Sequence, residues 1–167
     1  MMIRAKLTAL AILVCTQSDF AAETIDAPEG SALAFKYSAR GEQIYQCNST
    51  NDGYQWRLTG PRADLFDASA AKVGRHYAGP TWEADDGSLI RGKVIAHQKS
   101  PDGVSVAWLL LSVAAHEGQG RMSDIAYVRR IDTKGGAAPQ TPCAADEAGQ
   151  SSGSPYEANY LFYRAAK

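Results

Sequence analysis

The chain has 167 residues, with 17 lysines and arginines, 18 aspartates and glutamates, and a formal net charge of −1. This length suits one domain with a real hydrophobic core. Because the charge is near neutral and no basic run occurs, the composition argues against a nucleic-acid-binding protein and against attachment to an anionic membrane.

The N-terminus has the pattern of a secretory signal peptide. Arg4 and Lys6 form a positive start, and a short apolar run follows them. That run is too short for a transmembrane helix, which needs about 20 residues. We therefore predict a signal peptide over residues 1–22 and one exported β domain, periplasmic or secreted, over residues 23–167.

The cleavage site is expected between Ser18 and Ala22, where small residues recur. The alternative is a lipoprotein, with Cys15 as the lipidated residue. A lipoprotein signal has a small residue directly before that cysteine, and Val14 stands there instead. We therefore expect Cys15 to leave with the signal peptide.

Alternating apolar residues predict strands in the first half of the chain, and Asp-Gly pairs predict the tight turns between them. The residues expected to share a face are Leu33, Phe35 and Tyr37 in the first strand, and Tyr54, Trp56 and Leu58 in the next. The Asp-Gly pairs are residues 52–53, 86–87 and 102–103. Residues 61–73 fit either a strand or a helical turn.

Further strands are predicted in the second half. Residues 82–97 are typical of two strands joined by a turn, and residues 125–131 of one more. Residues 104–113 are apolar on both faces, which favours a central buried strand over a helix because turn residues bound the run closely. The final strand, residues 156–163, has Tyr156 and Tyr160 on one face.

Many short strands with frequent turns predict an all-β fold, either an antiparallel β-sandwich or a small β-barrel of eight to ten short strands. Residues 134–153 are rich in Gly, Ala, Pro and Ser and are expected to form one long C-terminal surface loop.

Two cysteines remain in the predicted mature chain, Cys47 and Cys143. In an oxidising compartment two cysteines are paired more often than free, so we predict a disulfide between them. In the chain-entropy model such a bridge contributes about 4–5 kcal/mol of stability. The alternative is two separate buried thiols. Neither cysteine has the spacing of a zinc ligand, and we predict no metal and no cofactor.

Chemically active side chains are densest in residues 74–88. The candidate ligand-binding residues there are His76, Tyr77, Trp82, Glu83 and Asp85. A turn at residues 79–80 would fold His76 back toward Asp85, and a carboxylate beside the imidazole would raise the histidine pKa. The alternative is purely structural: Trp82 lies in the core, residues 86–87 form a hairpin turn, and the charges are solvated.

Several sequence phrases together resemble domain-of-unknown-function family 3455, which contains exported bacterial and fungal proteins. They are residues 41–47 (GEQIYQC), 76–83 (HYAGPTWE), 86–88 (DGS), 108–111 (WLLL) and 127–136 (YVRRIDTKGG), with the ending at residues 155–163. The resemblance implies export, one domain and pairing of Cys47 with Cys143. It implies no catalytic residue.

The sequence contains no nucleophile elbow, no P-loop and no dinucleotide-binding glycine pattern. The leading hypothesis is therefore an exported, non-enzymatic module that binds a small molecule or a protein partner. One alternative is a hydrolase in which His76 works with Asp85 or Glu83. Another, by fold-level analogy, is an inhibitor of a cell-wall lytic enzyme.

Overall fold

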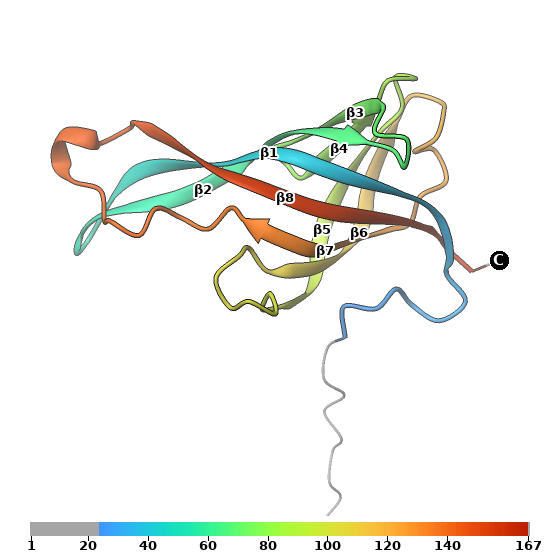
Figure 1. Ribbon diagram of the computed structural model, residues 1–167, viewed down its shortest axis with the longest axis horizontal. Coiled ribbons are helices and arrows are strands. Elements are labelled where there is room, and N and C mark those ends of the chain that lie inside the picture. Colours follow the sequence, from blue (N-terminus) through green and yellow to red (C-terminus); the bar gives the residue numbers. More distant parts are fainter. Residues whose placement is uncertain (1–23, 167) are drawn as a thin grey trace, which may run out of the picture.

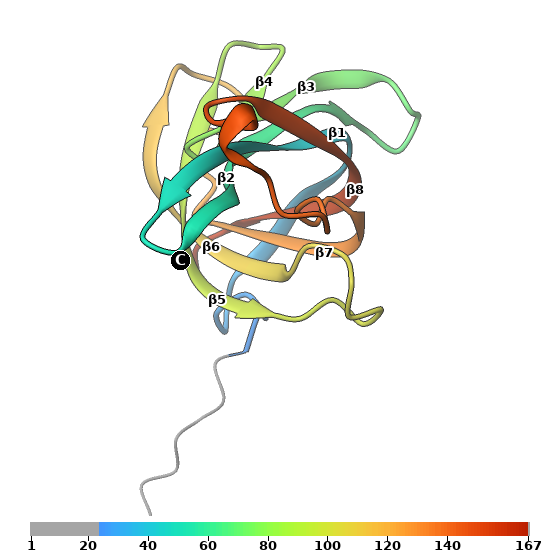
Figure 2. The same cartoon turned by 90° about the vertical axis from the view of Figure 1, so that its left-hand side faces the viewer.

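The computed structural model describes residues 24–166 (Figure 1). Eight strands form one antiparallel sheet, and the last strand pairs with the first, so the sheet closes into a barrel (Figure 2). The strands are β1 (Ala32–Thr50), β2 (Gly53–Phe66), β3 (Lys72–Tyr77), β4 (Thr81–Ala84), β5 (Leu89–Gln98), β6 (Trp108–Glu117), β7 (Tyr127–Gly135) and β8 (Ser151–Arg164); one 3₁₀ turn, η1, spans Ala145–Glu147.

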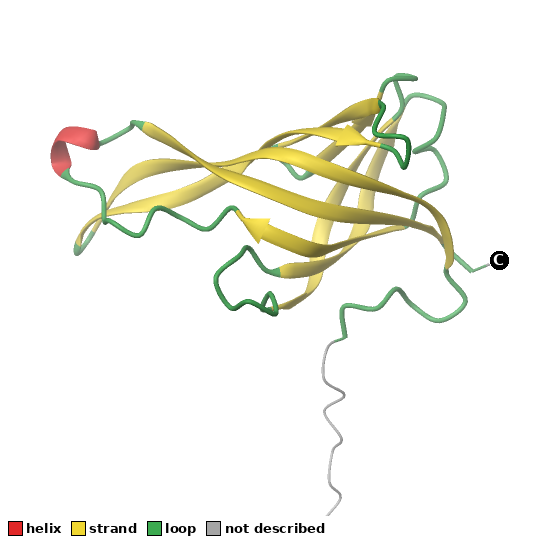
Figure 3. Cartoon of the chain, viewed as in Figure 1, coloured by secondary structure: helices red, strands yellow, loops and turns green. Residues whose placement is uncertain are grey.

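The predicted all-β class is confirmed, and of the two architectures left open the closed one is observed. The expectation of uniformly short strands is wrong for three of them. β1 has 19 residues, and β2 and β8 have 14 each. Their far ends run beyond the other five strands as a three-stranded arm, with η1 near its tip (Figure 3).

The barrel core is built from inward side chains of alternate residues. On β8, Tyr156, Tyr160 and Phe162 are buried, as their shared parity predicts. On β1 the expectation fails at Leu33, which is 54% exposed, because a bulge between Leu33 and Phe35 shifts the alternation by one residue.

The strand predicted from residues 104–113 begins later, at Trp108, because Asp102 holds the preceding residues in a turn. Its carboxylate accepts hydrogen bonds from the backbone of Val104 and Ser105. The prediction of burial on both faces is confirmed: Leu111 belongs to the barrel core, and Leu110 packs in an outer cluster with Ile25.

One end of the barrel is closed by the β6–β7 connection. Met122 and Ile125 of this loop are fully buried in the core. The backbone N–H of Met122 donates to Ser88 Oγ, and the Arg121 guanidinium donates to the hydroxyl of Tyr37. These contacts fix the loop between β1 and the β4–β5 turn.

The loop after β7 lies along the arm, and the predicted disulfide ties it there. Cys47 in β1 bonds to Cys143 in the loop, with a Cα–Cα distance of 6.0 Å. The Tyr45 hydroxyl donates to Gly136 O at 2.7 Å, and the Trp56 indole N–H to Thr141 O at 3.1 Å. The predicted loop is confirmed over residues 136–150, with η1 inside it, whereas residues 134–135 still belong to β7 and residues 151–153 already belong to β8.

Within residues 24–166, no helix has the length and apolar character needed to cross a membrane. The predicted signal peptide, residues 1–22, lies outside the described residues.

Candidate functional site: a cavity inside the barrel

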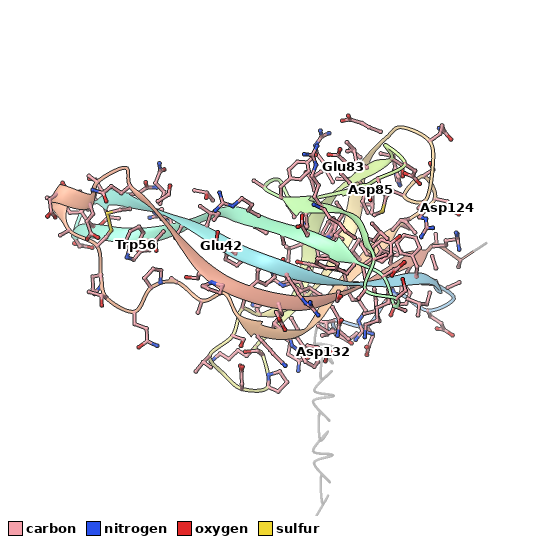
Figure 4. All side chains as sticks on the ribbon, turned by 45° about the horizontal axis from the view of Figure 1, so that its top comes forward. Glu42, Trp56, Glu83, Asp85, Asp124 and Asp132 are labelled. Atoms are coloured by element: carbon pink, nitrogen blue, oxygen red, sulfur yellow. A yellow bond between two sulfur atoms is a disulfide. The ribbon has the colours of Figure 1, made fainter. Side chains whose placement is uncertain are left out.

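The β3–β4 hairpin carries the predicted site residues and divides them between two faces. Its register pairs His76 with Trp82 and Arg75 with Glu83. Because neighbouring residues of a strand point to opposite sides, His76 and Trp82 lie inside the barrel, while Tyr77 and Glu83 lie outside. Glu83 and the exposed Asp85 are labelled on this outer side in Figure 4.

The outer residues form a hydrogen-bonded cluster. Arg75 donates to both carboxylate oxygens of Glu83 at 2.9 and 3.0 Å, and the Tyr77 hydroxyl donates to Glu83 at 2.8 Å. The Arg75 guanidinium, and then the Tyr77 hydroxyl, hold the pKa of Glu83 below its usual range. Both carboxylate oxygens of Glu83 thus accept hydrogen bonds from its neighbours on the barrel surface.

The same face continues as a row of alternating charges across the sheet. The register aligns Arg40, Asp64 and Arg75 on adjacent strands. Arg40 faces Glu157 at 3.9 Å, and Asp64 accepts from Lys72 at 2.8 Å. A surface concavity of about 550 Å³ lies above this row. Among the described residues, the charged side chains that line this concavity have ion-pair partners, namely Arg40, Arg62, Asp64 and Arg75.

His76 is buried with 2% of its surface exposed, and its ring stacks on Trp82 at 4.5 Å between centroids. Its Nδ1 lies 2.7 Å from the carbonyl oxygen of Thr81. Burial lowers the histidine pKa to about 3, against the raising effect of that hydrogen bond, and the positive charge of Arg130 lowers it further.

The expected pairing of His76 with Asp85 is therefore not observed, and the expected rise of the pKa is wrong. The tight turn places Trp82, not Asp85, opposite the imidazole. Asp85 instead donates its backbone N–H to Val73 O and is exposed. The imidazole is neutral at ordinary pH. Since Nδ1 must donate to a carbonyl, Nε2 carries the lone pair.

A cavity of about 260 Å³ lies beside His76 and Trp82, at the end of the barrel away from Met122. Strands from the whole ring contribute to its wall. The lining residues are Gln43, Leu58, Thr59, Gly60, Pro61, His76, Gly79, Pro80, Trp82, Val94, Leu109, Leu111, Arg130 and Tyr160.

The cavity opens where the short β3–β4 hairpin ends. The last β2–β3 pair is Arg62 with Tyr77, so residues 58–61 of β2 pass the hairpin turn without a ladder partner on that side. Gly60 lets the turn approach closely, since a Cβ there would lie 2.7 Å from Ala78 Cα. Two exposed apolar side chains, Leu58 and Val94, form the rim.

Two residues that line the cavity carry buried polar atoms that no protein group satisfies. Gln43 is 1% exposed, and neither its amide nitrogen nor its amide oxygen has a hydrogen-bond partner. The Trp82 indole Nε1 is buried and unpartnered as well. Buried polar groups are hydrogen-bonded in the great majority of cases, so three such atoms on one cavity are a strong local exception.

Two residues of this site, Gln43 and Arg130, were absent from the candidates predicted from sequence. Gln43 shares its parity with the buried Ala39, Tyr45 and Cys47 on β1. Arg130 shares its parity with the fully buried Val128 on β7. The signal available in the sequence was a polar residue at a strand position whose alternate neighbours are apolar and face the core.

The fold and the site define an antiparallel eight-stranded barrel that is plugged at one end and hollow at the other. Residues 28–164 match the family model described as "Protein of unknown function (DUF3455)", and the chain belongs to that family, as the sequence phrases indicated. No curated protein and no solved structure matches the chain. Within residues 24–166 no group of three or more His, Cys, Asp or Glu side chains is placed to hold a metal ion.

Proposed function

We propose that the protein is an exported binding module that holds a small molecule inside its barrel. The observation that carries this proposal is the set of unpartnered atoms on Gln43 and Trp82 at an apolar cavity. Leaving a buried donor or acceptor unpaired costs about 1–3 kcal/mol per group. A ligand that supplies hydrogen bonds to these atoms removes that cost. Part of its binding free energy comes from this gain.

The size of the cavity limits the ligand. Its volume of about 260 Å³ lies just below the range of about 300–1,000 Å³ that drug-sized ligands occupy. A molecule of about ten non-hydrogen atoms therefore suits it. Leu109 and Leu111 line one wall and His76 stacked on Trp82 another, which favours a planar or short aliphatic body.

The hydrolase alternative receives less support from the same geometry. It requires a carboxylate next to His76, but Glu83 lies on the opposite face of the hairpin, bound by Arg75 and Tyr77. A histidine with a pKa of about 3 is also a weak general base at neutral pH. We therefore assign His76 a role in shaping the cavity and accepting a hydrogen bond.

Isothermal titration calorimetry with benzyl alcohol, indole and 1-hexanol tests the proposal. We expect at least one of them to bind with a dissociation constant near 1 mM or below, which is about −4 kcal/mol and within the limits for ligands of this size. The variant Val94→Trp places a large side chain at the rim and should abolish binding.

The matched control is Ile95→Trp. Ile95 is the exposed apolar neighbour of Val94 but does not line the cavity, so this variant should bind like the native protein. Failure of these three compounds and of small carboxylates such as benzoate to bind the native protein would contradict the proposal. So would equal loss of binding in the two tryptophan variants.

A further inference from the structure

Arg130 brings a positive charge into the cavity wall and has no acidic partner. Its Nε and Nη2 both donate to the carbonyl oxygen of Ala107, at 3.0 and 2.8 Å. Among the described residues no carboxylate oxygen lies within 4 Å of its guanidinium. The Ala107 carbonyl fixes the side chain but does not neutralise its charge.

The neighbouring arginine shows the contrast. Arg129 points to the opposite face of β7, and its guanidinium pairs with Asp26 at 2.9 Å. Taking a guanidinium out of water without a counter-ion is unfavourable, and arginines are almost never fully buried unless they are paired. Arg130 is half-buried. Arg130 thus lacks the negatively charged partner that Arg129 has in Asp26, and a bound anion would supply one.

The charge of Arg130 acts on the interior of the barrel. Burial raises the pKa of Tyr45, Tyr156 and Tyr160, and the positive charge of Arg130 acts against that rise. At His76 burial lowers the pKa and Arg130 acts in the same direction. None of these four side chains supplies a negative charge to compensate the guanidinium.

Donors remain free to bind an anion. A guanidinium has five N–H groups, and the Ala107 carbonyl takes one from Nε and one from Nη2 of Arg130. The Arg130 side chain also donates a hydrogen bond to the Tyr160 hydroxyl, and the N–H groups that then remain lie on the edge that pairs with the oxygens of a carboxylate. Two further unpartnered donors, the amide nitrogen of Gln43 and the indole nitrogen of Trp82, belong to residues that line the same cavity.

We propose that the ligand is a small carboxylic acid, bound as the carboxylate, with its charged group at Arg130 and its apolar body between Trp82 and the leucines of β6. The inference rests on the proposed function and specifies its ligand class. A monoanion balances the single charge of Arg130. A cavity of about 260 Å³ has room for a carboxylate and one ring or a short chain.

Calorimetric titrations with pairs of equal shape test the inference. Benzoate is compared with benzamide, and hexanoate with hexanamide, at pH 7.5. In each pair the two molecules differ in charge and hardly in size. We expect each carboxylate to bind at least about tenfold more tightly than its amide, because hydrogen bonds to a charged group are stronger than those between neutral groups. The variant Arg130→Gln should reduce this ratio to about one, and Arg130→Lys should retain part of it.

Arg129→Gln is the matched control, because it removes one arginine from the same strand without changing the cavity, and it should keep the full ratio. Equal binding of carboxylates and amides to the native protein would overturn the carboxylate inference while leaving a binding cavity in place. If neither class binds, the proposed function itself fails. Competition by inorganic phosphate as strong as that by benzoate would overturn the part of the inference that concerns the apolar body.

Discussion

The neutral, buried state of His76 predicts how the stability of the protein depends on pH. The histidine pKa is 6.5 when unperturbed and about 3 in the folded barrel. Below pH 6.5 the unfolded chain binds a proton that the folded chain does not bind. The free energy of unfolding therefore falls as the pH is lowered from about 6.5 toward 3.

The size of this effect follows from the two pKa values. At pH 4.5 the pH is two units below the pKa of the unfolded imidazole, which corresponds to about 3 kcal/mol of lost stability. The folded imidazole is still neutral there and contributes almost nothing. Other groups also titrate in this range, so the effect of His76 is isolated by comparison with a variant that cannot titrate.

The suitable variant is His76→Gln. Its side chain is polar and neutral at every pH, and it loses the stack on Trp82, so we expect it to be less stable than the native protein by about 1–3 kcal/mol at pH 7.5. Urea unfolding followed by circular dichroism at pH 7.5, 6.5, 5.5 and 4.5 gives both free energies. The native protein should lose about 3 kcal/mol more than the variant between pH 7.5 and pH 4.5. Parallel pH profiles would refute the buried neutral imidazole.

Three further outcomes are expected. Replacing Cys47 and Cys143 together by serine should lower the free energy of unfolding by up to about 4–5 kcal/mol in urea titrations, and a loss below about 1 kcal/mol would contradict a stabilising bridge. Gly92→Ala puts a Cβ 2.9 Å from the ring of Trp82 and should destabilise the barrel by about 1–3 kcal/mol, measured in the same way; an unchanged stability would show that the indole has room to move. Intact-mass measurement of the exported protein should give a chain that lacks the predicted signal peptide and is two mass units lighter than its reduced form.

The fold class was predictable because its signals are local. Two of the three Asp-Gly pairs form the β1–β2 and β4–β5 turns, and the third lies in the β5–β6 connection. The parity of Tyr156, Tyr160 and Phe162 also matches their burial. The bulge that exposes Leu33 was not predictable, since it depends on how β1 pairs with β8 at a sequence distance of more than 100 residues.

The site was only half predictable for the same reason. His76 and Trp82 are neighbours across one hairpin, so sequence proximity found them, although it could not decide which side each faces. Gln43 and Arg130 reach the cavity from strands remote in sequence, and closure of the ring brings them together. The spacing of residues within one segment does not reveal that residues of distant strands lie next to each other.

The β3–β4 hairpin has a consequence for engineering the molecule. Its outward side chains, Arg75, Tyr77 and Glu83, contact each other, whereas its inward pair, His76 and Trp82, contacts the cavity. The two sets are separated by the backbone and share no side-chain contact. Surface charge can thus be changed at Arg75, Tyr77 and Glu83, for solubility or immobilisation, separately from changes to the cavity wall at His76 and Trp82. Thr81 is not available for such surface changes, because it is buried.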